Sequence, residues 1–68
     1  MYPNVRAEMA RQGLSVADLA DSLNISLSTM YGKLRGQYPI TLIEAKAIKK
    51  IVKSEDPIEK LFEYQEVE

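Results

Sequence analysis

The stretch that decides the fold is residues 16–36, VADLADSLNISLSTMYGKLRG, whose pattern predicts two short helices joined by a tight turn. Ser15, with Asp18 three residues later, is close to a capping box and marks the start of the first helix. Apolar residues then recur with the spacing of an amphipathic helix, at Val16, Leu19, Ala20 and Leu23. A helix of about two turns does not persist alone in water, so it must pack against other elements.

The second half of this stretch carries its own start and stop signals. Asn24 tolerates the left-handed backbone conformation that ends helices, so it is the expected end of the first helix. Ser26 is the expected cap of the next helix, and Gly36 its expected end. Met30 and Leu34 lie four residues apart, which places both on one inward face.

The outer face of this second helix is unusual. It carries Leu27, Ser28, Tyr31 and Gly32, small or apolar residues where a solvated helix usually shows charge. Ala20, small and in the middle of the first helix, lets the second helix cross close to it. Two helices at a steep angle with a three- or four-residue turn form a helix-turn-helix unit. In such a unit the second helix projects from the body, so that its first residues can enter a DNA major groove.

The remaining segments also predict helices. Pro3 fits the first turn of a helix that runs to about Gln12, with Gly13 as its stop. Thr41 and Glu44 form a capping box that opens a helix over residues 41–52. Its inward residues are expected to be Leu42, Ala45, Ile48, Ile51 and Val52, and its outward residues Lys46, Lys49, Lys50 and Lys53.

The last helix is predicted from residues 56–59, where Asp56 is the expected cap and Pro57 the first helical residue. Ile58, Leu61 and Phe62 share one apolar face. The chain therefore predicts an all-α domain of five short helices over residues 1–64, with an acidic end at 65–68 that frays.

Charge and composition limit the kinds of partner and ligand that the protein is expected to bind. The net charge is −1, yet residues 1–53 carry eight basic and four acidic side chains, and residues 54–68 carry one basic and six acidic. A basic body favours an anionic partner, whereas the simpler interpretation is a solvated surface with an acidic tail. The chain has no Cys and no His, which removes disulfides and the usual zinc ligands. We expect no catalytic residues, cofactor, metal or small-molecule ligand, no membrane segment, and a cytoplasmic location.

The string over residues 16–36 resembles the helix-turn-helix of the Cro/C1-type (XRE-like) family of phage and bacterial repressors. The shared features are Ala20, the turn at residues 24–26, apolar Met30 and the closing Gly36. The resemblance to short prophage members extends through TLIEAKAIKKIV and PIEKLFE. It implies a lambda-repressor-like bundle of four to five helices that binds operator DNA, commonly as a dimer.

The sequence departs from the family pattern at two positions. Asn24 stands where members usually have Gly, which is a mild change. Lys33 stands where many members have an apolar residue, and Leu34 takes that place one residue later. A slightly rotated second helix is one consequence that this change allows.

Residues that contact DNA follow from the family's use of the second helix. The resemblance assigns base reading to Leu27, Ser28, Thr29, Tyr31 and Gly32. The expected phosphate contacts are Ser26, Lys33, Arg35, Gln37 and Tyr38, with help from Arg6 and Arg11. Three assignments have alternatives: Ser26 as a helix cap, Thr29 as a capping or packing residue, and Gly32 as either a point of close approach or a position without contact.

These features predict a sequence-specific, double-stranded-DNA-binding transcriptional regulator of the prophage repressor type. Repression and activation both stay open. A homodimer on DNA is expected, for which Ile58, Leu61, Phe62 and Tyr64 supply either the dimer contact or part of the domain's own core. The alternative function is a protein-binding adaptor of the same fold, such as an antitoxin-like or anti-repressor module.

Overall fold

Five helices follow the start and stop signals in the sequence. The computed structural model describes residues 2–65. Its helices are α1 (Pro3–Gln12), α2 (Val16–Leu23), α3 (Leu27–Arg35), α4 (Leu42–Ile51) and α5 (Ile58–Leu61). Residues 2–65 contain no strand, which confirms the prediction of an all-α domain of five short helices.

Local hydrogen bonds fix the ends of the central helices. Both predicted capping boxes form: the Ser15 backbone N–H donates to Asp18 over 2.8 Å, and the Thr41 backbone N–H donates to Glu44 over 3.0 Å. Asn24 ends α2 with a φ of 58°, in the left-handed region, as expected. The start and end of α2 and the start of α4 are therefore set by residues at those helix ends.

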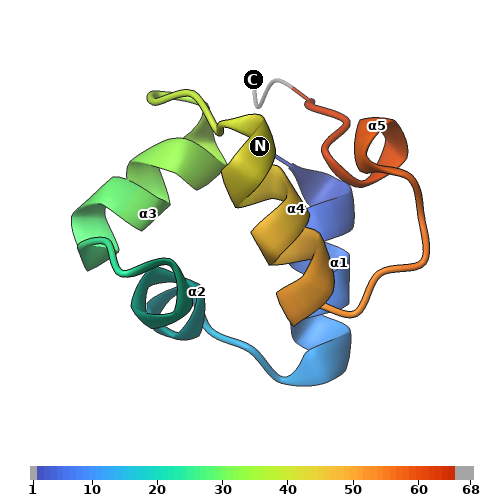
Figure 1. Ribbon diagram of the computed structural model, residues 1–68, viewed down its shortest axis with the longest axis horizontal. Coiled ribbons are helices and arrows are strands. Elements are labelled where there is room, and N and C mark those ends of the chain that lie inside the picture. Colours follow the sequence, from blue (N-terminus) through green and yellow to red (C-terminus); the bar gives the residue numbers. More distant parts are fainter. Residues whose placement is uncertain (1, 66–68) are drawn as a thin grey trace.

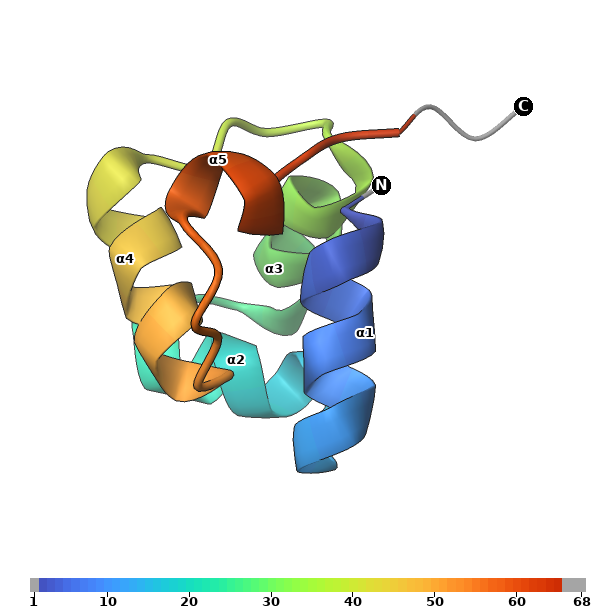
Figure 2. The same cartoon turned by 90° about the vertical axis from the view of Figure 1, so that its right-hand side faces the viewer.

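The helices surround one core. In Figure 1, α2 and α3 lie on one side, α5 lies on the other, and α4 crosses in front of α1. Figure 2, turned by 90°, shows α5 near the top of the view, level with the start of α4 and close to the start of α1. Contacts join α2 to α3 and α4, and α5 to α1 and α4, within a domain of 27 × 26 × 22 Å.

The core draws at least one side chain from every helix. Met30 and Leu34 of α3 are both buried, as their spacing predicts. The other fully buried large side chains are Val5, Leu19, Ile48, Val52 and Leu61. Leu61 was expected to supply either a dimer contact or part of the domain's own core. Because it is fully buried, it belongs to the core.

Two details of the predicted helices are wrong. Leu42, expected to face inward, is 62% exposed, because it lies at the edge of an open groove and not in the core. Pro57 is the N-cap of α5 and not its first helical residue, and Asp56 does not cap the helix. The backbone of Pro57 is extended, and α5 is only four residues long. Of the acidic end, Gln65 lies outside any helix, and residues 66–68 lie outside the described residues.

Candidate nucleic-acid interface

The turn between α2 and α3 brings the two helices close together. Ala20 is buried where the helices meet, and its carbonyl accepts a hydrogen bond from the Ile25 backbone N–H over 3.0 Å. Ile25 is partly buried against the core. The turn is therefore held both by a backbone bond to α2 and by an apolar anchor, which fixes the direction in which α3 leaves it.

Ser26 caps α3, as the sequence predicts. Its hydroxyl oxygen accepts from the Thr29 backbone N–H over 3.2 Å, and its hydroxyl donates to the Thr29 hydroxyl over 2.8 Å. The Ser28 hydroxyl lies 3.4 Å from that of Ser26. Ser26 and Thr29 thus bond to each other at the helix start, and Ser28, like Ser26, is exposed.

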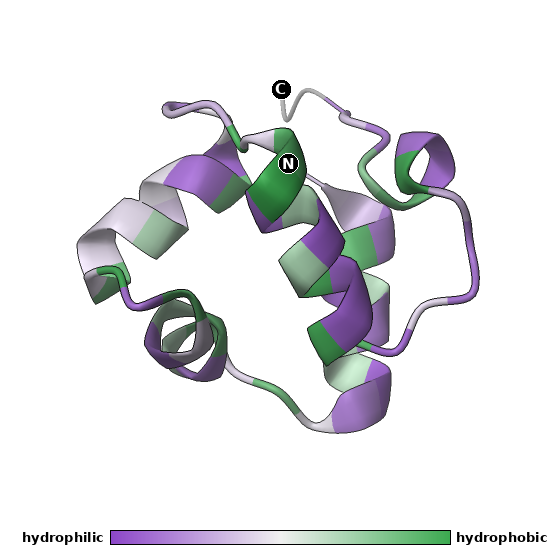
Figure 3. Ribbon diagram, viewed as in Figure 1, coloured by the Kyte–Doolittle hydropathy of each residue, from purple (hydrophilic) through white to green (hydrophobic). Residues whose placement is uncertain are grey.

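An exposed face of low charge follows along α3. Leu27 is 47% exposed, and Ser28 and Tyr31 are exposed as well. Figure 3 shows the first turns of α3 mostly pale, with some hydrophobic segments, and the end of the helix mainly hydrophilic. The face proposed from the sequence is therefore open to solvent at Leu27, Ser28 and Tyr31.

Gly32 lies on the side of α3 that faces away from the core, but it is not open to solvent there. It is buried, and the group that approaches it is the ring of Tyr38. A Cβ at position 32 would lie only 2.4 Å from two atoms of that ring. Glycine at this place therefore makes room for a tyrosine of the same chain.

Lys33 is not available as expected for a phosphate contact. Its ammonium donates to Glu44 Oε1 over 3.0 Å and to the Pro39 carbonyl over 3.0 Å, and its side chain is only 12% exposed. This position, apolar in many members of the resembling family, joins α3 to α4 through an ion pair. Lys33 is therefore used in this ion pair, and Leu34, the next residue, is buried in the core.

The end of α3 carries the exposed cation of this helix. The Arg35 guanidinium lies over the Tyr31 ring, with its Cζ atom 5.4 Å from the ring centroid, a cation–π geometry. Gln37 and Tyr38 are exposed in the connection that follows. Of the five expected phosphate contacts, Arg35, Gln37 and Tyr38 present exposed side chains beyond the helix start.

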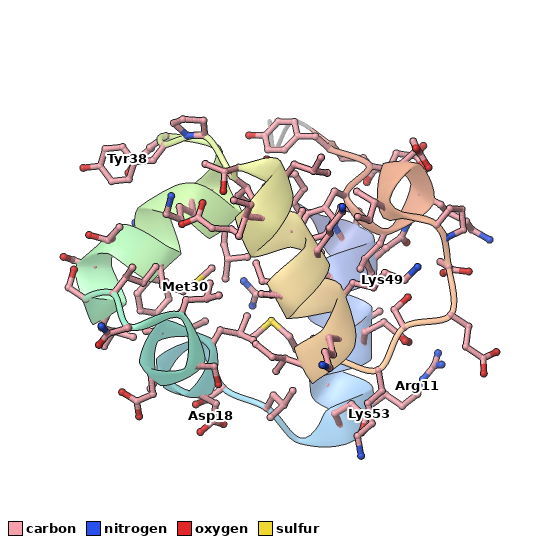
Figure 4. The ribbon with its side chains drawn as sticks, viewed as in Figure 1. Arg11, Asp18, Met30, Tyr38, Lys49 and Lys53 are labelled. Atoms are coloured by element: carbon pink, nitrogen blue, oxygen red, sulfur yellow. The ribbon has the colours of Figure 1, made fainter. Side chains whose placement is uncertain are left out.

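Arg11, Lys49 and Lys53 lie away from this face. Arg11 pairs with Glu8 over 2.9 Å on α1. Figure 4 shows Lys49 pointing from α4 to the side where α5 lies, with Lys53 near Arg11 at the lower end of the molecule. Arg6 is exposed on α1. Lys49 and Lys53 are thus not an extension of the α3 face.

Two features were missed by sequence reasoning. Tyr64 lies against Gly36, and its hydroxyl donates to the Arg35 carbonyl over 3.0 Å.

Leu42 and Ile43, 62% and 82% exposed, begin α4 beside a groove of about 290 Å³. The groove is lined by Tyr2, Ile40, Leu42, Ala45, Ile58 and Phe62. The two adjacent apolar residues just after the Thr41 cap were the sequence signal for an exposed apolar site.

The hydrogen bonds that Glu44 accepts lower its pKa. Its hydrogen bond from the Thr41 backbone, followed by that from Lys33, lowers the pKa of Glu44 below its ordinary value of 4.5. A hydrogen bond from the Ser15 backbone likewise lowers the pKa of Asp18 below 3.8. Since both groups have depressed pKa values in the folded state, their contribution to stability is complete above the ordinary values and is lost as the pH falls through the folded ones.

We expect the variant Glu44→Gln to reveal this dependence. Glutamine still accepts the capping bond, but it leaves the nearly buried Lys33 cation without an anion. At neutral pH the variant should be less stable than the parent protein, and the difference should shrink as the pH falls through the folded pKa of Glu44. Urea unfolding followed by circular dichroism at several pH values measures both; a gap that stays constant down to acid pH would contradict the assignment.

Other kinds of site find no support within the described part of the chain. Residues 2–65 contain no group of three or more acidic residues arranged to hold a metal ion. None of the helices described is long and apolar enough to cross a membrane. A scan against protein-family models, a search of curated proteins and a search of solved structures each found no match.

Proposed function

We propose that the protein is a sequence-specific, double-stranded-DNA-binding transcriptional regulator of the prophage repressor type. The observation that carries this proposal is the α2–turn–α3 unit, in which α3 is anchored by Met30 and Leu34 and exposes Leu27, Ser28 and Tyr31. A helix held in this way can lie in a major groove with its first residues against the base edges.

The exposed side chains suit base reading. The Ser28 hydroxyl both donates and accepts hydrogen bonds, so it can contact any base edge, and Leu27 can pack against a thymine methyl group. Tyr31 is held by Arg35, whose guanidinium is then placed for a phosphate. Ser26 and Thr29, which bond to each other, act in this proposal mainly by holding the helix start.

Selection of bound duplexes from a random pool tests the proposal. A family of enriched sequences with a shared motif would support it. If the protein binds as a homodimer, the motif should contain two half-sites about 34 Å apart, one helical turn of DNA. Failure to retain any duplex at low salt would contradict it.

The salt dependence of binding should separate Arg35 from Lys33. Arg35→Met removes an exposed cation, so the slope of log affinity against log salt should become shallower by about 0.9. Lys33→Met removes a cation that is already paired with Glu44, so this slope should stay unchanged. Filter binding or fluorescence anisotropy from low to moderate salt measures both. The assignment is wrong if the two variants change the slope equally.

One observation favours the alternative of a protein-binding module. Leu42 and Ile43 form an exposed apolar pair at the start of α4, and Figure 3 shows this turn strongly hydrophobic. Three of the four residues considered for a dimer contact make contacts within the domain: Leu61 is buried, and the rings of Phe62 and Tyr64 pack edge to face against Tyr2. The fourth, Ile58, lines the groove beside Leu42. A protein without affinity for any duplex would make the adaptor the leading function.

A further inference from the structure

The position on α3 that points most directly away from the core is Gly32. Two residues along an α-helix correspond to about 200° of rotation, so Gly32, two residues from both Met30 and Leu34, lies opposite both of them. It lies on the same side as Ser28, four residues earlier. Yet Gly32 is buried, since the Tyr38 ring covers it. Figure 4 shows Met30 pointing into the body and Tyr38 on the outer side of the same helix.

Three further contacts hold Tyr38 in this place. The backbone N–H groups of Gln37 and Tyr38 both donate to the Gly32 carbonyl, over 2.9 and 3.3 Å. The Lys33 ammonium donates to the Pro39 carbonyl over 3.0 Å while it pairs with Glu44. The backbone of the connection after α3 is therefore held on both sides of Tyr38, which keeps this residue beside Gly32.

The exposed part of Tyr38 is then a surface that α3 presents outward. Tyr38 is 51% exposed although one side of its ring lies on Gly32. A phenol combines an apolar ring, which suits a thymine methyl group, with a hydroxyl that donates and accepts hydrogen bonds. In any complex where the outer face of α3 enters a major groove, this ring lies between the helix and the bases.

We infer that Tyr38 is a specificity-determining residue that reads bases in place of a side chain at position 32, and that Gly32 is its positioning residue. The inference rests on the proposed DNA-binding function and changes the role of Tyr38, which the sequence had suggested as a phosphate contact. It also predicts how Gly32 acts: a side chain there displaces the Tyr38 ring and does not itself meet the DNA.

The test compares the base preferences of the parent protein, Tyr38→Ala, Tyr38→Phe and Gly32→Ala in random-pool selection. Tyr64→Ala is the matched control. Like Tyr38, Tyr64 is about half exposed and lies against a glycine, in this case Gly36 at the end of α3. We expect Tyr38→Ala to reduce discrimination at one or two base pairs per half-site by about fivefold or more. Gly32→Ala should change the same base pairs, and Tyr64→Ala should keep the parent's preferences.

A measurement on the free protein accompanies the selection. In the NMR spectrum, the Gly32 α-protons should be shifted by the ring current of Tyr38, and Tyr38→Ala should remove that shift. Tyr38→Phe should keep the shift and lose only preferences that depend on the hydroxyl. This readout tests the packing of Tyr38 on Gly32 whether or not DNA is bound.

The outcomes are distinct. An enriched motif that Tyr38→Ala and Gly32→Ala leave unchanged would overturn the inference and leave the proposed function standing. Tighter binding by Tyr38→Ala with unchanged preferences would also overturn it, because Tyr38 would then obstruct the groove. Absence of any enriched motif for the parent protein would overturn the proposed function, and the reading role of Tyr38 with it, even where the NMR shift is present.

Discussion

Replacing Leu34 with alanine is expected to lower the free energy of unfolding by about 2–5 kcal/mol, the usual cost of emptying a fully packed leucine site. Leu34 is buried at the centre of α3's inward face. A chain of 68 residues has a stability of only about 3–10 kcal/mol, so a large share of it depends on this side chain. Urea unfolding followed by circular dichroism gives the loss directly.

Leu27→Ala is the matched control, since it makes the same change on the same helix at a residue that is 47% exposed. It should change stability by no more than about 0.5 kcal/mol, and its effect should appear in DNA binding. Equal losses from the two variants would mean that α3 is oriented differently. The assignment of Leu27, Ser28 and Tyr31 to an outer reading face would then fail as well.

Replacing Gly36 with alanine should produce the second large effect. Gly36 ends α3 with a φ of 85°, where a side chain costs about 1–2 kcal/mol. A Cβ there would also lie 2.7–2.9 Å from atoms of Tyr64, whose hydroxyl bonds to the Arg35 carbonyl. Both the strain and the displacement of Tyr64 lower the free energy of unfolding, which thermal and urea unfolding measure.

Gly13→Ala separates these two causes. Gly13 ends α1 with a φ of 67°, yet nothing lies within 4 Å of a Cβ built there, so only the strain applies. Gly36→Ala should therefore cost more than Gly13→Ala in the parent protein, and about the same in a Tyr64→Ala background. A cost at Gly36 that is no larger than the cost at Gly13 would argue against any role of Tyr64 at the end of α3.

The boundaries of α2 and α3 and the start of α4 were predictable from sequence because their causes are local, whereas the predicted start of α5 was wrong. Ser15, Ser26 and Thr41 each bond to a residue three positions later, and Asn24 and Gly36 adopt the left-handed conformation at the helix ends. The inward residues of α3 were likewise predictable, since periodicity alone places Met30 and Leu34 together. Such features need no knowledge of how distant segments meet.

The candidate site was predictable only in part, because its remaining features depend on longer contacts. Periodicity places Gly32 on the outer face, but it does not show that Tyr38, six residues later, folds back over it. Lys33 meets Glu44 eleven residues away. Leu42 follows the inward spacing of α4, yet its exposure depends on which elements cover the helix end. Each of these required the tertiary structure.

The aromatic contacts of Tyr64 have a consequence for the order of synthesis. Tyr64 packs against Tyr2, with ring centroids 5.2 Å apart, and bonds to the carbonyl of Arg35, 29 residues earlier. A chain made from its N-terminus therefore holds both helices of the helix-turn-helix well before the residue that completes the end of α3. The hydrogen bond from Tyr64 to the end of α3 can therefore form only after position 64 has been synthesised, whereas the local bonds of Gly36 that end α3 can form before it.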